Sequence, residues 1–273
     1  MGLEGYYWRV YEPGWSALAI AGVCPDWAMV VLATSAGEVW TEIVDAPWIS
    51  PDGLGVDAGP LRADGESLRV DLGPGLDVRF QQRREWPRRF SPLGPAQMVP
   101  FLGQYWAPWL LSARVSGTIG TRSLDGLSGY AEKNWGALFA EHWWWGQAEF
   151  VAFAGGRVHG VAPTAVAVWT PDEVVTLAPP FARTVTRAGG GEWAVRASNW
   201  RWHVEIEGEA SDPLLLPVPI PRERRLDVRS RHHLLGRVHV VVRRGRRVWF
   251  RGESSVAALE DGAKCVQRAS KPA

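Results

Sequence analysis

Hydrophobic and polar residues alternate along much of the chain, as they do in strands of an antiparallel sheet with one buried face. In 201–208, RWHVEIEG, the apolar Trp202, Val204 and Ile206 alternate with polar residues, and valines recur in the same way in 236–244, GRVHVVVRR. No window of about 12 residues shows helical periodicity. Short segments of this alternating kind recur between Gly, Pro, Asp and Ser residues, so the pattern predicts an all-β protein, either a barrel or a sandwich.

Two stretches rich in proline and arginine interrupt the alternation. They are 84–100, REWPRRFSPLGPAQMVP, and 211–227, SDPLLLPVPIPRERRLD. We interpret both as irregular, the first as a crossover, because proline cannot donate a backbone hydrogen bond to a sheet. We place a boundary near residue 120, which gives an N-terminal β unit of residues 1–120 and a C-terminal β unit of residues 121–273.

Composition narrows the classes of function. The chain has 273 residues, of which 46% are hydrophobic and 22% charged, and its net charge is +1. Because no field of one sign is large, a nucleic-acid partner is not expected. The basic clusters 83–90 and 243–247 are interpreted as solvated turns, with contact to a phosphate or lipid headgroup as the alternative. The 17 tryptophans are the unusual feature, since each offers a large apolar surface and one N–H donor.

Other features set expectations for location and cofactors. Cys24 and Cys265 lie near opposite ends and form neither a disulfide framework nor a metal-binding spacing. The first 15 residues lack the features of a signal peptide, and no apolar run is long enough to span a bilayer. We therefore expect a cytoplasmic protein, with contact to a membrane surface left open. No phosphate loop, dinucleotide fingerprint, HExxH or GxSxG element occurs, so neither a metal nor a cofactor is expected.

The segment 129–150, GYAEKNWGALFAEHWWWGQAEF, combines charged and amide groups with a run of aromatic residues. Its GYAEKNWG and WWWGQAEF blocks resemble the signature of the tocopherol cyclase family. Further similar islands are EGYYWRVYEP (4–13), LGQYWAPWLLSARVSGTI (102–119) and SSVAALEDG (254–262). The residues that match the signature are Tyr130, Glu132, Lys133, Asn134, Trp135, Gly136, Trp143, Trp145 and Gln147.

The resemblance implies a lipocalin-like antiparallel β-barrel, in two β units around an apolar cavity. It also implies cofactor-independent closure of a prenylated hydroquinone to a chromanol, or the related hydration of an isoprenoid. Such ring closure needs an acid that protonates an alkene, walls that tolerate a carbocation, and a phenol oxygen held within reach. Water must be kept away because it would capture the cation.

Glu132 is our candidate for the acid, because aromatic surroundings raise a carboxyl pKa by desolvation. In a strand, Glu132 and Asn134 share one face while Lys133 and Trp135 share the other. Lys133 is a candidate to orient a quinol oxygen, or to pair with a carboxylate such as Glu149 or Asp125. The alternative for Glu132 and Lys133 is a buried salt bridge that only braces the fold.

The remaining candidates could contact a substrate, but each could instead have only a structural role. Alternation places Trp143, Trp145 and Gln147 on one face, which we favour for the cavity, although packing between sheets explains it too. Trp106 and Trp109 are assigned to a barrel mouth or to plain packing. Tyr130, Asn134, Trp135 and Gln147 are predicted to contact substrate, and His142 is either another proton donor or part of a solvated turn.

Three readings of the function follow. The first is a tocopherol-cyclase-like enzyme that acts on an isoprenoid in a Trp-lined pocket. The second is a carrier that binds a hydrophobic small molecule without changing it, and the third is a remnant of the fold without a ligand. An enzyme requires a carboxyl group with a raised pKa that faces the cavity, whereas a carrier requires only apolar walls.

Overall fold

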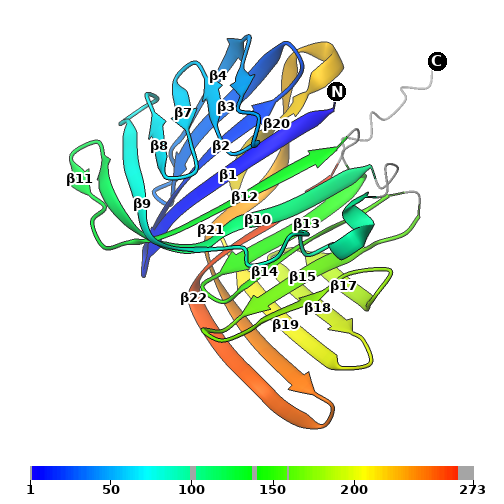
Figure 1. Ribbon diagram of the computed structural model, residues 1–273. Coiled ribbons are helices and arrows are strands. Elements are labelled where there is room, and N and C mark those ends of the chain that lie inside the picture. The colour runs from blue at the N-terminus through cyan, green and yellow to red at the C-terminus, as the bar shows by residue number, and fades with distance from the viewer. Residues whose placement is uncertain (1, 99–102, 137–139, 159, 264–273) are drawn as a thin grey trace, which may run out of the picture.

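The computed structural model describes residues 2–98, 103–136, 140–158 and 160–263, and the fold is all-β (Figure 1). Antiparallel strands form two sheets, and the described residues contain two short 3-10 helices but no α-helix. The sheets curl and pack against each other, with the β21–β22 hairpin extending to the far end of the second one (Figure 1). The prediction of an all-β, antiparallel barrel architecture in two β units is therefore confirmed.

The first sheet contains the N-terminal strands in the order β4-β3-β2-β1-β12-β10-β9-β8-β7-β6-β5, with β11 paired to β10. Its strands are β1 (Leu3–Glu12), β2 (Trp15–Val23), β3 (Trp27–Thr34), β4 (Val39–Asp45), β5 (Trp48–Ile49), β6 (Val56–Ala58), β7 (Leu61–Ala63), β8 (Ser67–Val70), β9 (Leu76–Glu85), β10 (Gln104–Ile119), β11 (Arg122–Ser123) and β12 (Ser128–Gly136). The 3-10 helix η1 (Gly94–Met98) lies between β9 and β10.

The second sheet has the order β16-β15-β14-β13-β22-β21-β19-β18-β17, with β20 paired to β21. Its strands are β13 (His142–Ala148), β14 (Val151–Arg157), β15 (Thr164–Trp169), β16 (Val174–Leu177), β17 (Arg183–Gly189), β18 (Glu192–Ser198), β19 (Trp202–Ala210), β20 (Leu214–Ile220), β21 (Arg225–Arg244) and β22 (Arg247–Ala263). The 3-10 helix η2 (Pro221–Glu223) connects β20 to β21.

The division between the sheets falls between Gly136 and His142, later than the boundary that we expected near residue 120. Strand β12, which carries the EKNWG block, pairs with β1 on one side and with β10 on the other. It is therefore a central strand of the first sheet rather than part of the C-terminal unit. The pairing of β1 with β12 joins residues more than a hundred positions apart, which local patterning does not reveal.

Alternation along the strands separates the apolar side chains into layers. On β1, Tyr6, Trp8 and Val10 point into the core of the first sheet, whereas Tyr7 and Tyr11 point into a layer between the two sheets. On β13, Trp144 belongs to the core of the second sheet and Trp145 to the layer between the sheets. The layer between the sheets therefore receives one face of strands from both halves of the chain.

The two stretches that we interpreted as irregular differ in structure. The described part of the first stretch, residues 84–98, runs from the end of β9 through η1. The next strand, β10, is the neighbour of β9 in the sheet, so the chain does not pass to a distant strand here. The second stretch, by contrast, contains the strand β20, although Pro217 and Pro219 lie within it. The backbone nitrogens of residues two positions apart point to the same edge of a strand. In an edge strand the two prolines can therefore lie where no N–H group is needed to pair with the neighbouring strand.

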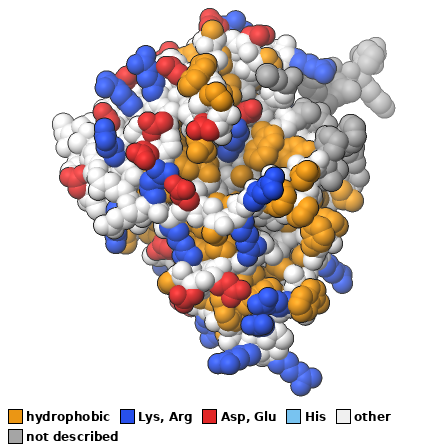
Figure 2. Space-filling view, in the orientation of Figure 1, with side chains coloured by type: hydrophobic (Ala, Val, Ile, Leu, Met, Phe, Trp, Pro, Cys, Tyr) orange, Lys and Arg blue, Asp and Glu red, His pale blue; other side chains and the backbone are white. Residues whose placement is uncertain are grey.

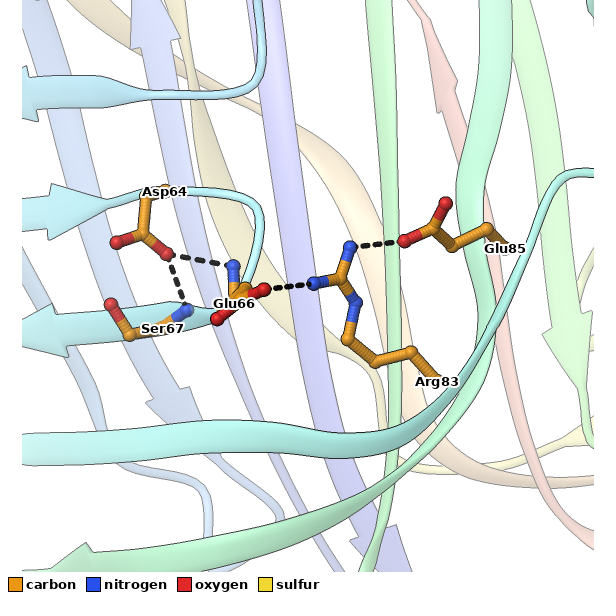
Figure 3. Close-up of polar contacts among 5 residues, drawn as sticks. All are labelled: Asp64, Glu66, Ser67, Arg83 and Glu85. Carbon is orange, nitrogen blue, oxygen red and sulfur yellow. Dashed lines mark hydrogen bonds and ion pairs between the residues drawn. The ribbon is translucent and has the colours of Figure 1, made fainter.

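The basic cluster at residues 83–90 begins with an arginine that links β9 to the turn between β7 and β8 (Figure 3). Asp64 accepts hydrogen bonds from the backbone N–H groups of Glu66 and Ser67 at 2.7 and 2.6 Å, which closes the β7–β8 turn. Arg83 on β9 forms ion pairs with Glu66, at 3.1 Å, and with Glu85. This part of the cluster therefore has acidic partners within the chain.

Candidate functional site

A cavity of about 1060 Å³ lies in the layer between the two sheets. The first sheet contributes residues from β1, β2, β3, β10 and β12, and the second from β13, β14, β15, β17, β20, β21 and β22. Most of the wall is apolar or aromatic, as in cavities that bind small organic ligands. The expected apolar cavity between two β units is therefore present.

The mouth of the cavity is apolar as well. Val161 and Phe181 line the cavity, yet 62% and 61% of their surfaces are exposed, so the cavity meets solvent beside them. Figure 2 shows hydrophobic side chains gathered on the side of the molecule where η1 and β17 lie in Figure 1. A hydrophobic ligand would therefore meet an apolar surface before it enters.

Glu132 is a buried acid in the cavity wall, with only 3% of its surface exposed. Its position follows from the alternation of β12, because Ala131 points into the core of the first sheet. Trp106 donates a hydrogen bond from Nε1 to Glu132 Oε2 at 2.8 Å, and the Tyr130 hydroxyl group donates one to the same oxygen at 2.6 Å. A protonated carboxyl group can accept both bonds on Oε2 while it carries its proton on the other oxygen.

Burial raises the pKa of Glu132 to about 7, because the charged form loses its hydration. The hydrogen bonds from Tyr130 and Trp106 act in the opposite direction, and the negative charge of Glu260 adds to the rise. The indole Nε1 of Trp145 is buried without a hydrogen-bond partner among the described residues. Glu132 can therefore hold a proton near neutral pH.

A second polar cluster is contributed mainly by the other sheet. The Tyr7 hydroxyl group lies 3.2 Å from His232 Nε2, and His232 Nδ1 lies 2.9 Å from Glu260 Oε2. Trp143 donates a hydrogen bond from Nε1 to Glu260 Oε1 at 2.6 Å. Burial alone would raise the pKa of Glu260, but the hydrogen bonds from His232 and Trp143 lower it.

The two clusters lie on facing walls and meet at Tyr7. Tyr7 and Glu132 are direct partners on the neighbouring strands β1 and β12. The Trp145 ring packs between the clusters, 4.9 Å from the Tyr7 ring and 5.5 Å from the His232 ring, measured between centroids. The cavity thus brings together a carboxyl group with a raised pKa and one with a lowered pKa, a combination found where acid and base chemistry share one site.

Several predicted residues line this cavity. They are Glu132, Asn134, Trp106, Trp143 and Trp145. As expected, Glu132 and Asn134 share the cavity face of β12. Trp144, which alternation assigned to the opposite face, also lines the cavity, and its Nε1 donates a hydrogen bond to Thr164 at 2.8 Å.

Other predicted residues lie elsewhere. Lys133 points to the other side of β12 and pairs with Glu4 at 2.6 Å, so it forms no salt bridge with Glu132 and reaches neither Glu149 nor Asp125. Trp135 stacks on Tyr105 with ring centroids 5.4 Å apart and is not part of the cavity wall. Tyr130 contributes only through its hydrogen bond to Glu132, Trp109 packs against the core of the first sheet, and His142 is exposed on β13.

Gln147 lies outside the cavity wall because a buried arginine reaches it from the first sheet. Arg9 donates hydrogen bonds to Gln147 Oε1 at 2.7 Å and to the carbonyl groups of Leu234 and Val256 at 2.8 and 2.6 Å. Gln147 therefore takes part in a link between the two sheets. The expectation that it shares the cavity face with Trp145 holds for the layer between the sheets but not for the cavity itself.

The sequence reasoning missed Tyr7, His232 and Glu260 as site residues. Tyr7 lies in the island 4–13 and Glu260 in the island 254–262, so the resemblance already covered both positions. His232 belongs to the pair His232–His233, which lacks any motif spacing. Only the pairing of β21 with β22, which sets His232 opposite Glu260, brings these groups together.

Other kinds of site find no support in the part of the chain that is described. Among these residues, no group of three His, Cys, Asp or Glu side chains could hold a metal ion. Cys24 is buried, and Cys265 lies outside the described residues. Within the same ranges, no helix has the length and apolar character needed to cross a membrane.

We compared the chain with known families, curated proteins and solved structures. No protein-family model matches the chain, and no curated protein matches its sequence. A similar solved structure is that of a protein described as a "putative ATTH" from Nitrosomonas europaea, with 14% identity and a TM-score of 0.42. The match covers 96% of this chain and 92% of that one.

Proposed function

We propose that this protein is a tocopherol-cyclase-like enzyme, which closes a ring in a prenylated quinol or a related isoprenoid by acid–base chemistry. The observation that carries this proposal is the buried Glu132, whose pKa of about 7 leaves a protonated carboxyl group in the wall of an aromatic cavity. Burial next to tryptophan is an established way to keep a carboxyl group protonated near neutral pH.

Each step of the reaction has a group to support it. Glu132 transfers its proton to one carbon of a trisubstituted alkene, which leaves a tertiary cation on the other carbon. The faces of Trp106, Trp143 and Trp145 attract such a cation without reacting with it. The phenol oxygen of the substrate then forms a C–O bond to the cation and releases its proton, so the product is an isomer of the substrate.

The size and character of the cavity agree with a long apolar substrate. A volume of about 1060 Å³ lies just above the usual range for small-molecule sites, about 300–1000 Å³. An apolar wall also limits the access of water to the reacting groups, where water would otherwise convert the cation to an alcohol. The mouth at Val161 and Phe181 provides an apolar route for the prenyl chain.

The alternative is a carrier of a hydrophobic molecule, which the apolar wall and mouth favour equally. The two functions differ in the need for Glu132. A carrier keeps its affinity when this carboxyl group is replaced by an amide, whereas the enzyme loses its proton donor.

Incubation of purified protein with a geranylgeranylated hydroquinone in D₂O tests the proposal. We expect a chromanol that carries one carbon-bound deuterium, and we expect Glu132→Gln to form none while it still binds the probe in native mass spectrometry. Glu42→Gln, which changes an exposed glutamate on β4, is the matched control and should react like the wild type. Retention of the probe by the wild type without deuterium uptake would identify a carrier, and no retention would contradict both functions.

A further inference from the structure

Tyr7, His232 and Glu260 form a chain of polar groups that ends at the cavity. Tyr7 and Glu260 line the cavity, whereas His232 lies behind them with no exposed surface. The two contacts in the chain, at 3.2 and 2.9 Å, have hydrogen-bond distances. Tyr7 and His232 are buried and Glu260 is partly buried, and burying such polar groups is costly unless they are paired. Their arrangement on the cavity wall therefore calls for an explanation beyond packing.

The donor and acceptor roles in this chain follow from the chemistry of its ends. A glutamate carboxylate can only accept hydrogen bonds, so the Glu260 contact requires a proton on His232 Nδ1. In a neutral imidazole the other nitrogen then carries a lone pair, and His232 Nε2 accepts the Tyr7 hydroxyl proton. Trp143 occupies the other oxygen of Glu260, which fixes the carboxylate in place.

We propose that Tyr7, His232 and Glu260 form the catalytic base of the cavity, a relay that removes the proton from the substrate hydroxyl group as the ring closes. This inference rests on the proposed function and adds the partner that Glu132 requires. In the step, the substrate oxygen forms its bond to the cationic carbon and gives its proton to the Tyr7 oxygen. Tyr7 passes its own proton to His232 Nε2, and the resulting imidazolium is paired with the Glu260 carboxylate.

The position of Tyr7 suits this role. Residues directly opposite on antiparallel strands have Cβ atoms about 5 Å apart, and Tyr7 is opposite Glu132 on the same face of the sheet. One substrate can therefore meet the acid and the base at neighbouring points of the wall. Burial raises the pKa of the Tyr7 hydroxyl group, so Tyr7 keeps its proton at rest and passes it on only as it receives another.

The relay also accounts for the return of the enzyme to its starting state. After one turnover Glu132 has lost one proton and is a carboxylate, and His232 has gained one proton and is an imidazolium. The total number of protons on the protein is therefore unchanged. Transfer of the His232 proton back through Tyr7 to the adjacent Glu132, directly or through water, restores both groups. An isomerisation needs such a closed cycle, because the product contains the same atoms as the substrate.

Tyr7→Phe tests the relay because it removes the hydroxyl group and keeps the ring. With the geranylgeranylated hydroquinone in D₂O, we expect ring closure to fall about 100-fold, the lower range for loss of a general base. Glu132 still protonates the alkene, so deuterium should appear instead in uncyclised alcohol or recovered alkene. The matched control is Tyr11→Phe, which removes a buried hydroxyl group on the same strand but outside the cavity wall and should change the product ratio less than about twofold.

The outcomes separate the two proposals. Wild-type protein that takes up no deuterium would overturn the proposed function together with the role of the relay in it. Normal ring closure by the wild type and by Tyr7→Phe would overturn the relay alone. The ¹⁵N signals of His232 at pH 7 provide a readout that does not depend on folding of a variant. We expect a protonated Nδ1 and an unprotonated Nε2, and either the opposite tautomer or an imidazolium would overturn the relay.

Discussion

Replacement of Glu132 by glutamine should remove a specific part of the pH dependence of stability. The pKa of Glu132 rises from its ordinary value of 4.5 to about 7 in the folded protein. Between these two values the folded state holds a proton that the unfolded chain has released. The contribution of Glu132 to the free energy of unfolding is therefore fully present below pH 4.5, and it is lost as the pH rises through about 7.

The size of this effect follows from the shift itself. One pKa unit corresponds to about 1.4 kcal/mol, so a rise from 4.5 to about 7 corresponds to about 3 kcal/mol. Glu132 is almost completely buried, so solvent screening does not reduce this value greatly. Glutamine resembles the protonated acid, because its carbonyl oxygen can accept the hydrogen bonds from Trp106 and Tyr130.

Urea unfolding at several pH values between 5 and 8, followed by tryptophan fluorescence, measures the effect. The free energy of unfolding of the wild type, relative to that of Glu132→Gln, should fall by about 2–3 kcal/mol across this range. Glu42→Gln removes one negative charge at the surface and should keep the wild-type pH dependence. Parallel curves for the wild type and Glu132→Gln would refute the reasoning, because they would mean that Glu132 is ionised in the folded protein throughout.

Three further predictions follow from the same contacts. Trp106→Phe removes a hydrogen bond that lowers the Glu132 pKa, so the pH at which this stability is lost should move upward in the same urea titration. Arg9→Lys should lower the free energy of unfolding at pH 7 by about 3 kcal/mol, because an ammonium group cannot reach all the acceptors that the buried guanidinium group satisfies; a loss below about 1 kcal/mol in urea unfolding would contradict this. Lys133→Met should leave deuterium uptake from D₂O unchanged and cost at most about 1 kcal/mol, because Lys133 forms a half-exposed pair with Glu4 away from the cavity.

The sequence predicted local features of the fold well and long-range ones poorly. Alternation correctly placed Glu132 and Asn134 on one face of β12, because the side-chain period of a strand is independent of its neighbours. It could not place β12 itself, since the partners β1 and β10 come from distant parts of the chain. The strand β20 was missed because its prolines suggest a loop, although an edge strand tolerates them.

Long-range contacts also determine which of the predicted residues reach the candidate site. Alternation grouped Trp145 with Gln147, and both do face the layer between the sheets. Which of them reaches the cavity depends on Arg9, a residue of the other sheet that occupies the space beside Gln147. No pattern within residues 129–150 contains that information.

The location of the cavity follows from how the two sheets are filled. Each sheet packs an apolar core of its own. The layer between the sheets is different, because it combines bulky aromatic rings with buried polar groups from both halves of the chain. Glu132 and Tyr7 come from the first sheet, whereas His232 and Glu260 come from the second. In the mechanism that we propose, the substrate meets Glu132 and Tyr7 on the first sheet, whereas the second sheet supplies His232 and Glu260. The packing of the two sheets therefore sets the distance between the Tyr7 hydroxyl group and its proton acceptor.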